Sequence, residues 1–254
     1  MKYTKLVSFK KTLRPLLTNM QHNPSPLKRG LGVSRSHKIN SMKIEIWSDI
    51  MCPFCYIGKK RFDDAMAQFA NKSEVTVEWK SFMLSPELKT DPSKNINQML
   101  AEHKGIPLEE AKEMNDHVTK MAAESGLTYN FDKTVVANSF NAHRFIHFAK
   151  QYGKQSEAEE KVFSAYFTEG RNIDDAETLL SFAAELGLDT EKFANIMGSG
   201  AYAKDVMADI TEAQELGIRG VPFFVLNRKY AISGAQDTAT FLDTLEKAFA
   251  EGKN

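Results

Sequence analysis

The chain has 254 residues, of which 42% are hydrophobic and 26% are charged, a balance typical of globular proteins. This length allows one large domain or two small ones, and either would bury a substantial core. No stretch approaches the roughly 18 consecutive apolar residues of a membrane span, so the sequence predicts no integral membrane segment.

The formal net charge of zero conceals an uneven distribution. Residues 1–41 contain nine basic residues and no acidic one, which leaves 24 basic against 33 acidic residues in residues 42–254, a net charge of −9. Nucleic acid is therefore not expected as a partner, because phosphate binding requires clustered Lys and Arg.

We interpret residues 1–41 as an unstructured basic extension, with Met42 as the natural first residue of the domain. The arm contains no apolar stretch of the kind that secretory signals require. Its basic, acid-free composition is also found in organelle transit peptides, and this second interpretation stays open.

The predicted domain opens on a strand that leads into the only two cysteines of the chain, Cys52 and Cys55. Residues 43–47 alternate apolar and polar side chains, as a β-strand does. The segment after the cysteines places four side chains on one helical face: Gly58, Phe62, Met66 and Phe69. Pro53 suits the first helical position, so Cys52 is predicted at a helix N-terminus, where free amides and the dipole favour a thiolate.

This spacing favours redox chemistry over a metal site or two inert core cysteines. A thiolate is the nucleophile of disulfide exchange, and Cys55, one turn further on and more buried, is expected to resolve the mixed disulfide. A zinc site needs about four ligands, and beyond the cysteines only His143 and His147 have a suitable spacing. No metal is therefore expected. The absence of further cysteines for structural disulfides fits a reducing compartment.

A second strand is predicted at residues 75–79, and the long segment that follows it has helical patterns. The predicted helices run from Pro107 to Gly126, from an Asp174 cap to Gly187, from an Asp189 cap onward, and from Tyr202 to Leu216. The fold class is therefore α/β: a thioredoxin core at about 42–90 and 217–250, interrupted by an all-helical insertion at about 91–216.

Pro222 introduces the next apolar run, residues 223–226, which is predicted to be a buried strand. A thioredoxin-like fold requires a proline, usually cis, that opens this strand and packs beside the cysteine pair. We predict that the Val221–Pro222 bond is cis. An ordinary proline at the start of a strand is the alternative. A further strand is expected at 230–232, before a helix with an apolar stripe of Phe241, Leu245, Ala248 and Phe249.

Three motifs together resemble the FrnE-like branch of the DsbA family. They are residues 48–58 (SDIMCPFCYIG), 138–144 (NSFNAHR), and 217–225 (GIRGVPFFV) followed by 233–236 (SGAQ). The resemblance extends from residue 42 to about residue 249 and implies a cytoplasmic bacterial dithiol oxidoreductase with a thioredoxin fold and a helical insertion. The substrate-binding residues expected beside the catalytic Cys52 and Cys55 are Pro53, Phe54, Val221, Pro222, His143 and Arg144. For His143 and Arg144, helix packing is an equally open role.

The expected activity is thiol–disulfide exchange with protein or low-molecular-weight thiols, with the cysteine pair as the redox centre and glutathione as a conceivable co-substrate. The direction of electron flow stays open, because Phe54 stands where periplasmic DsbA has a His within its motif. One alternative is a glutathione-dependent isomerase or transferase of the 2-hydroxychromene-2-carboxylate isomerase or kappa-class type. Those proteins usually have Ser at the position of Cys52 and lack the second Cys. A binding module or chaperone without turnover is a third hypothesis.

Overall fold

The computed structural model describes residues 41–252, so the basic extension predicted for residues 1–41 lies almost entirely outside the described residues. A four-stranded sheet forms the centre, in the order β2-β1-β5-β6. The strands are β1 (Met42–Ser48), β2 (Val75–Ser81), β5 (Phe223–Leu226) and β6 (Tyr230–Ser233). β1 is parallel to β2 and antiparallel to β5, which pairs antiparallel with β6. All four predicted strands are confirmed.

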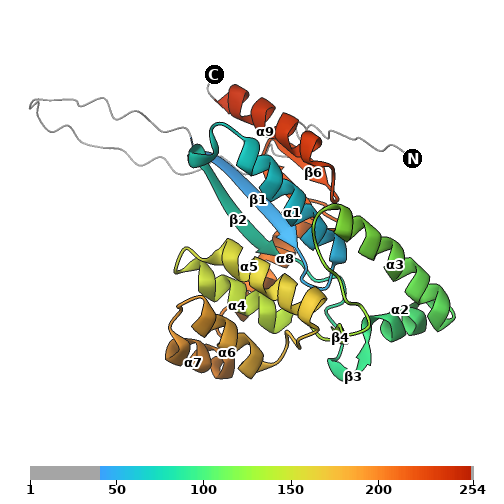
Figure 1. Ribbon diagram of the computed structural model, residues 1–254. Helices are drawn as coiled ribbons and strands as arrows, with labels where there is room; N and C mark the ends of the chain where they lie inside the picture. Colours follow the sequence, from blue (N-terminus) through green and yellow to red (C-terminus); the bar gives the residue numbers. More distant parts are fainter. Residues whose placement is uncertain (1–40, 253–254) are drawn as a thin grey trace, which may run out of the picture.

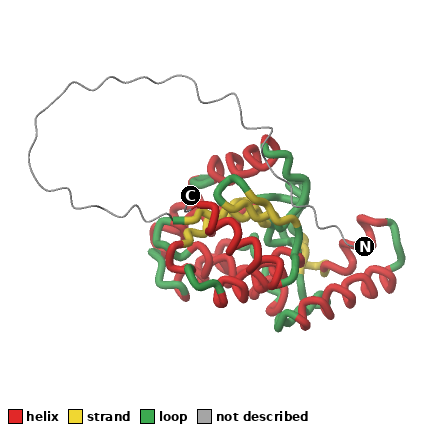
Figure 2. The backbone as a smooth tube through the Cα atoms, turned by 90° about the horizontal axis from the view of Figure 1, so that it is seen from above, coloured by secondary structure: helices red, strands yellow, loops and turns green. Residues whose placement is uncertain are grey.

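Helices cover both faces of this sheet (Figure 1; Figure 2). α1 (Pro53–Gln68) and α9 (Thr238–Gly252) pack together on one face, against the buried side chains of Ile44 and Ile46. Trp47 points to the opposite face, into a smaller cluster with Ala213, Ile218 and Val225. β1 is therefore buried on both sides, because successive side chains of a strand point to opposite faces of the sheet.

Aromatic side chains hold α1 on the sheet. Phe62 of α1 lies 5.5 Å from Phe224 of β5 and 5.8 Å from Phe241 of α9, measured between ring centroids. Phe69, beyond the end of α1, meets Phe249 edge to face at 5.5 Å. Aromatic pairs in these geometries contribute about 0.5–1.5 kcal/mol each beyond the area they bury. The helical face predicted from the sequence is the face that packs.

The segment between β2 and β5 contains most of the helices. They are α2 (Ile96–Lys104), α3 (Leu108–Glu124), α4 (Phe140–Lys150), α5 (Gln155–Ser164), the π-helical turn η2 (Ala165–Glu169), α6 (Ala176–Glu185), α7 (Thr190–Ser199) and α8 (Ala203–Glu215). In Figure 1, α2 and α3 lie on one side of the start of α1, and α4 to α7 lie on the other.

The sequence predicted an all-helical insertion, but the structure shows two short strands within it. β3 (Asp91–Asn95) and β4 (Val135–Val136) form a small antiparallel sheet within it. The Asn95 side chain accepts a hydrogen bond from the amide of Gln98 and so caps α2, which leaves the residues before it extended. β4 has only two residues, too few for an alternating pattern to be visible in the sequence.

α8, which the sequence assigned to the insertion, covers the second face of the sheet. The Trp47 indole donates to the Asp209 carbonyl oxygen at 3.1 Å. The Asp209 carboxylate accepts from the Ser81 amide at 3.0 Å and from Lys80 Nζ at 2.8 Å, and His147 Nε2 lies 3.0 Å away. α8 therefore packs on the central sheet and covers Trp47, and the predicted boundary of the insertion at about residue 216 stays a prediction.

One predicted helix cap is confirmed and one is displaced. Asp189 accepts from the Lys192 amide at 2.9 Å and caps α7, as predicted. Asp175, not Asp174, caps α6. The Asp174 carboxylate instead accepts from Thr90 and Asn141, and so connects the insertion to the segment after β2. Within residues 41–252, no helix has both the length and the apolar character needed to cross a bilayer.

Asp209→Asn should lower the free energy of unfolding by about 3 kcal/mol at pH 7, because it removes one partner of a buried charged network. Burial opposes ionisation of Asp209, but hydrogen bonds from His147, Lys80 and Ser81 hold its pKa below the ordinary 3.8. A lowered pKa gives stability that is present above pH 3.8 and is lost as pH falls further. The difference between variant and wild type should therefore shrink in acid.

Denaturant unfolding at pH 7 and pH 3 measures this difference. The matched control is Asp205→Asn on the exposed side of the same helix, expected within about 0.5 kcal/mol of wild type. Equal effects of the two substitutions at pH 7 would contradict the role given to Asp209.

Candidate functional site

The cysteine motif begins where β1 ends. The amide of Cys52 donates to the Asp49 carbonyl oxygen at 3.0 Å, which closes the turn after the strand. The buried Asp49 carboxylate accepts from the amides of Met51, at 3.2 Å, and Leu84, at 2.7 Å. Cys52 has extended backbone angles and is the N-cap of α1, with Pro53 in the first turn. The predicted position of Cys52 at a helix N-terminus is therefore confirmed.

The two cysteines differ in their exposure to solvent. Both thiols are free; Cys52 is 4% exposed and Cys55 is completely buried. The Cys55 amide donates to the Cys52 carbonyl oxygen at 2.9 Å, so the two residues share the first turn. Burial, followed by the neighbouring Cys52, raises the pKa of the Cys55 thiol well above its ordinary value. Cys55 is thus protonated at neutral pH, and the prediction that it is the more buried thiol is confirmed.

The loop before β5 closes over this turn. The Val221–Pro222 peptide bond is cis, as predicted. The Cys52 thiol donates to the Val221 carbonyl oxygen with a sulfur–oxygen distance of 3.6 Å. A Cβ atom on Gly58 would lie 2.8 Å from Pro222 Cγ, so only glycine permits α1 to approach the loop this closely. Pro222 therefore lies against the helix that carries the cysteines, while its predicted contact with the cysteine pair itself stays a prediction.

An apolar cavity of about 740 Å³ adjoins the motif on the side of α2 and α3. Its lining residues are mostly apolar and include Met51, Pro53, Phe54, Met99, Met114 and Phe131. Phe54, between the two cysteines, is 38% exposed, and Met114 is 41% exposed. The volume is that of a small-molecule or side-chain pocket, and flexible Met side chains adapt to varied shapes. Lys104, Glu110, Glu113 and His117 are the ionisable groups of its lining.

The structure corrects the expectation that His143 and Arg144 line a substrate cleft, because both side chains are buried. His143 Nε2 lies 3.0 Å from the Phe82 carbonyl oxygen and 3.7 Å from the Asp49 carboxylate, behind the motif. The Arg144 guanidinium donates to the carbonyl oxygens of Ala201, Ile196 and Met197. Arg144 therefore has the alternative role of helix packing.

Two further residues near the motif, Tyr129 and Glu159, were not predicted from the sequence, because both belong to the insertion. The Tyr129 hydroxyl donates to the Pro53 carbonyl oxygen at 2.6 Å and so braces the first turn of α1. Glu159 of α5 is 1% exposed, and burial raises its pKa to about 7. The helical spacing of Glu159 with Ala158 and Val162 could have indicated from the sequence that Glu159 lies on the buried face of its helix.

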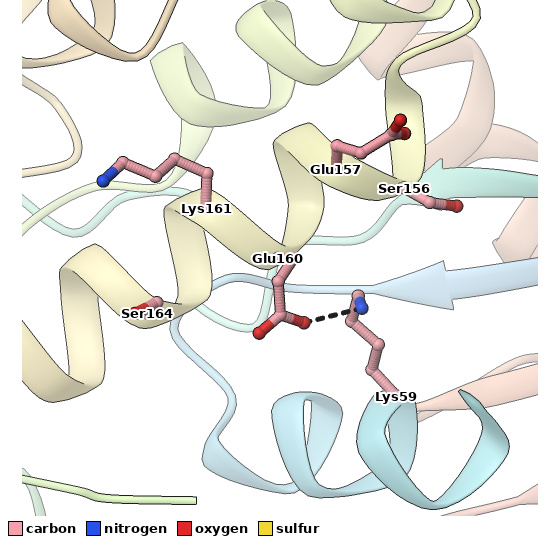
Figure 3. A pocket seen from close by; sticks show the side chains of 6 residues that line it. All are labelled: Lys59, Ser156, Glu157, Glu160, Lys161 and Ser164. Atoms are coloured by element: carbon pink, nitrogen blue, oxygen red, sulfur yellow. Dashed lines mark ion pairs between the residues drawn. The ribbon is translucent and has the colours of Figure 1, made fainter. Parts of the chain in front are cut away.

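Lys59 connects α1 with α5 beside this interior. Its ammonium group lies 2.7 Å from the Asp63 carboxylate and 2.6 Å from that of Glu160, and Figure 3 shows the pair with Glu160. Glu160 also accepts from the Tyr56 hydroxyl at 2.6 Å. Because Lys59 lies one turn after Cys55, these pairs hold the cysteine-bearing turn against the insertion.

No group of three or more His, Cys, Asp or Glu side chains within residues 41–252 is arranged to hold a metal ion. The two histidines considered as partners of the cysteine pair have other contacts. His147 lies against Ser81 and Asp209, and His143 lies against Phe82 and Asp49.

A thioredoxin-like sheet, a cysteine pair at a helix N-terminus and a cis-proline loop against it define a DsbA-type thioredoxin-fold protein. The chain matches the DSBA-like thioredoxin domain over residues 43–246. It therefore belongs to the DsbA-like family of thiol–disulfide oxidoreductases.

Known proteins agree with this assignment. A probable DsbA oxidoreductase from Streptomyces coelicolor is 38% identical, covers 83% of this chain and 91% of its own, and superposes with a TM-score of 0.77. An uncharacterized Bacillus subtilis protein, YwbO, is 30% identical over 83% of this chain and 97% of its own length. The cytosolic disulfide reductase DsbM of Pseudomonas aeruginosa, at 17% identity, covers 83% of this chain and 98% of its own with a TM-score of 0.57, a likeness of fold alone.

Gly58→Ala should displace the Pro222 loop and lower the free energy of unfolding by about 1–3 kcal/mol, because a Cβ has no room there. The rate of disulfide exchange should fall as well, because the displaced loop no longer lies against Cys52. The control is Gly198→Ala in α7, where nothing lies within 4 Å and the better helix propensity of Ala should add up to about 1 kcal/mol. Equal stability changes in both variants, by denaturant unfolding, would show that the close approach is unimportant.

The difference in burial predicts a difference in reactivity. At pH 7, iodoacetamide should label Cys52 in a Cys55→Ser variant at least about tenfold faster than it labels Cys55 in a Cys52→Ser variant, since Cys55 is buried and protonated. Mass spectrometry of timed samples gives both rates. Faster labelling of Cys55 would reverse the roles assigned to the two thiols.

Proposed function

We propose that the protein exchanges disulfides through a Cys52–Cys55 dithiol, with Cys52 as the attacking thiol and Cys55 as the resolving thiol. One observation carries the proposal. A thiol at the N-cap of α1 faces a backbone carbonyl of the cis-proline loop, while its partner three residues later is completely buried. The first thiol is placed to meet a substrate, and the second is placed to meet only the first.

In the reducing direction, the Cys52 thiolate attacks one sulfur of a substrate disulfide. The substrate S–S bond breaks, one substrate thiolate leaves, and Cys52 becomes joined to the other half. Cys55 then loses its proton and attacks Cys52 Sγ, which forms the Cys52–Cys55 disulfide and releases the second substrate thiolate. The substrate gains two electrons that the dithiol loses, and the oxidising direction is the reverse sequence.

Substrates would bind across the mouth of the site. Val221 offers backbone groups to an extended chain beside Cys52, and Pro222 packs behind it. Pro53 and Phe54 belong to the wall of the apolar cavity, which would receive a bulky apolar group next to the reacting sulfur. Protein disulfides and low-molecular-weight thiols are both within this chemistry, with glutathione as a co-substrate and no other cofactor.

The cytoplasm is the proposed location, because the two cysteines of the chain both belong to the motif. No role in nucleic-acid binding is proposed. The finer placement in the FrnE-like branch stays a prediction, and the direction of net electron flow stays open.

A glutathione-dependent isomerase is the alternative. A 2-hydroxychromene-2-carboxylate isomerase shares the fold at 17% identity and a TM-score of 0.57, a likeness that carries no activity. Such a reaction does not need a resolving thiol, whereas Cys55 lies in the same turn as Cys52 with its amide 2.9 Å from the Cys52 carbonyl oxygen. Removing Cys55 therefore distinguishes disulfide exchange, which would be impaired, from isomerisation, which would not.

Cys55→Ser should accumulate a mixed disulfide on Cys52 when it is mixed with oxidised glutathione or a protein disulfide, because the resolving step is lost. Turnover of the protein disulfide should fall by about tenfold or more. Intact-mass measurement detects the adduct, and Cys52→Ser, which has no attacking thiol, is the control. If Cys55→Ser trapped no adduct and turned over as fast as wild type, the dithiol mechanism would be wrong and the isomerase favoured.

A further inference from the structure

One backbone donor at the start of α1 has no acceptor among the described residues. The Cys52 amide donates to the Asp49 carbonyl oxygen at 3.0 Å, and Pro53 has no N–H. The Cys55 amide donates to the Cys52 carbonyl oxygen at 2.9 Å. The Phe54 amide remains, and it lies at the second helical position, from which a backbone N–H can reach the side chain of an N-cap residue.

Ionisation of Cys52 creates a need for this donor. In its thiol form Cys52 donates to the Val221 carbonyl oxygen, with 3.6 Å between sulfur and oxygen. A thiolate has no proton to donate and is repelled by the negative end of that carbonyl dipole. Its sulfur then requires N–H donors, and hydrogen bonds to a charged acceptor are roughly twice as strong as neutral ones. The free Phe54 amide is in the position to provide one.

The other end of the same peptide group is held by Tyr129. Its hydroxyl donates to the Pro53 carbonyl oxygen at 2.6 Å, and this oxygen shares one peptide plane with the Phe54 N–H. A hydrogen bond to the carbonyl oxygen draws electron density from the nitrogen and makes the N–H a stronger donor. Hydrogen bonds that follow one another in this way strengthen each other by about 10–30%.

Tyr129 is itself fixed in place by the π-helical turn η2 and the residue before which it ends. Its side chain is 5% exposed, and its ring stacks on that of Phe167 with centroids 4.8 Å apart. Its two chain neighbours are also fixed: the Asn130 amide donates to the Phe167 carbonyl oxygen at 2.7 Å, and the Thr168 hydroxyl donates to the Thr128 carbonyl oxygen at 2.6 Å. Burial raises the pKa of the Tyr129 hydroxyl far above its ordinary value, so it keeps its proton and remains a donor.

We propose that Tyr129 is a positioning residue for Cys52: its hydroxyl orients and polarises the Pro53–Phe54 peptide group, whose N–H then stabilises the Cys52 thiolate. This inference rests on the proposed dithiol function and deepens it. The Phe54 donor favours the reduced state, because the sulfur of a Cys52–Cys55 disulfide carries no negative charge. Tyr129 therefore makes that disulfide a stronger oxidant.

Equilibration with glutathione measures this effect. Wild type and Tyr129→Phe are incubated at pH 8 in mixtures of reduced and oxidised glutathione, quenched with acid and resolved into dithiol and disulfide forms by intact mass. Tyr129→Phe keeps the ring and loses only the hydroxyl. Its equilibrium should favour the disulfide by about threefold over wild type, a reduction potential more negative by about 14 mV.

Tyr56→Phe is the matched control. The Tyr56 hydroxyl donates to Glu160 at 2.6 Å, the same length as the bond made by Tyr129, and the two tyrosine rings stack with centroids 6.0 Å apart. Each substitution removes one contact between α1 and the insertion, but only Tyr129→Phe touches the Pro53–Phe54 peptide group. Tyr56→Phe should keep the wild-type equilibrium. Equal shifts in the two variants, or no shift in Tyr129→Phe, would overturn the proposal.

NMR of reduced, isotope-labelled wild type tests the Phe54 donor without any substitution at Tyr129. As pH rises and the Cys52 Cβ resonance reports ionisation, the Phe54 amide proton should move downfield, because it forms a hydrogen bond to a charged sulfur. The movement should be smaller in Tyr129→Phe and absent in Cys52→Ser. A Phe54 amide that did not respond to ionisation of Cys52 in wild type would contradict the proposed route.

The glutathione experiment also separates the role of Tyr129 from the function on which it rests. If wild type formed no Cys52–Cys55 disulfide at any ratio of oxidised to reduced glutathione, the dithiol function would fail and the role of Tyr129 with it. If wild type equilibrated with glutathione and Tyr129→Phe gave the same equilibrium constant, the role of Tyr129 alone would fail.

Discussion

The close approach of α1 to the Pro222 loop is the constraint on which the site depends. Gly58 lies in the second turn of the helix that carries both cysteines, and a Cβ there would lie 2.8 Å from Pro222 Cγ. This approach brings the Cys52 thiol to the Val221 carbonyl oxygen. Phe62, one turn beyond Gly58, packs into the aromatic cluster on the sheet and keeps the helix in that position.

The insertion contributes to the site from two directions. From outside, α2 and α3 form an apolar cavity with Phe54 at the motif. From inside, Tyr129 donates to the first turn of α1, and Glu160 of α5 pairs with Lys59 of α1. A thioredoxin core alone would have neither feature, so the insertion supplies both an apolar cavity beside the motif and polar contacts to α1.

Burial gives the two cysteines different chemistry within one helical turn. Cys52 is the N-cap of α1 and is 4% exposed, and the free amides of a helix N-terminus favour negative charge. Cys55 is completely buried, and desolvation raises its pKa. In the proposed dithiol mechanism, Cys52 attacks first, and the later attack by Cys55 requires that its thiol lose a proton.

Local patterns in the sequence determined the strands, the helix that begins after Cys52 and the loop at Pro222, because periodicity and proline geometry act over a few neighbouring residues. The cysteine spacing likewise determined the class of chemistry. Only the tertiary structure decided that α8 covers the sheet, that His143 and Arg144 are buried, and that Tyr129 contacts the first turn of α1. These contacts join residues far apart in the chain, and their pairing depends on how helices pack, which no local pattern encodes.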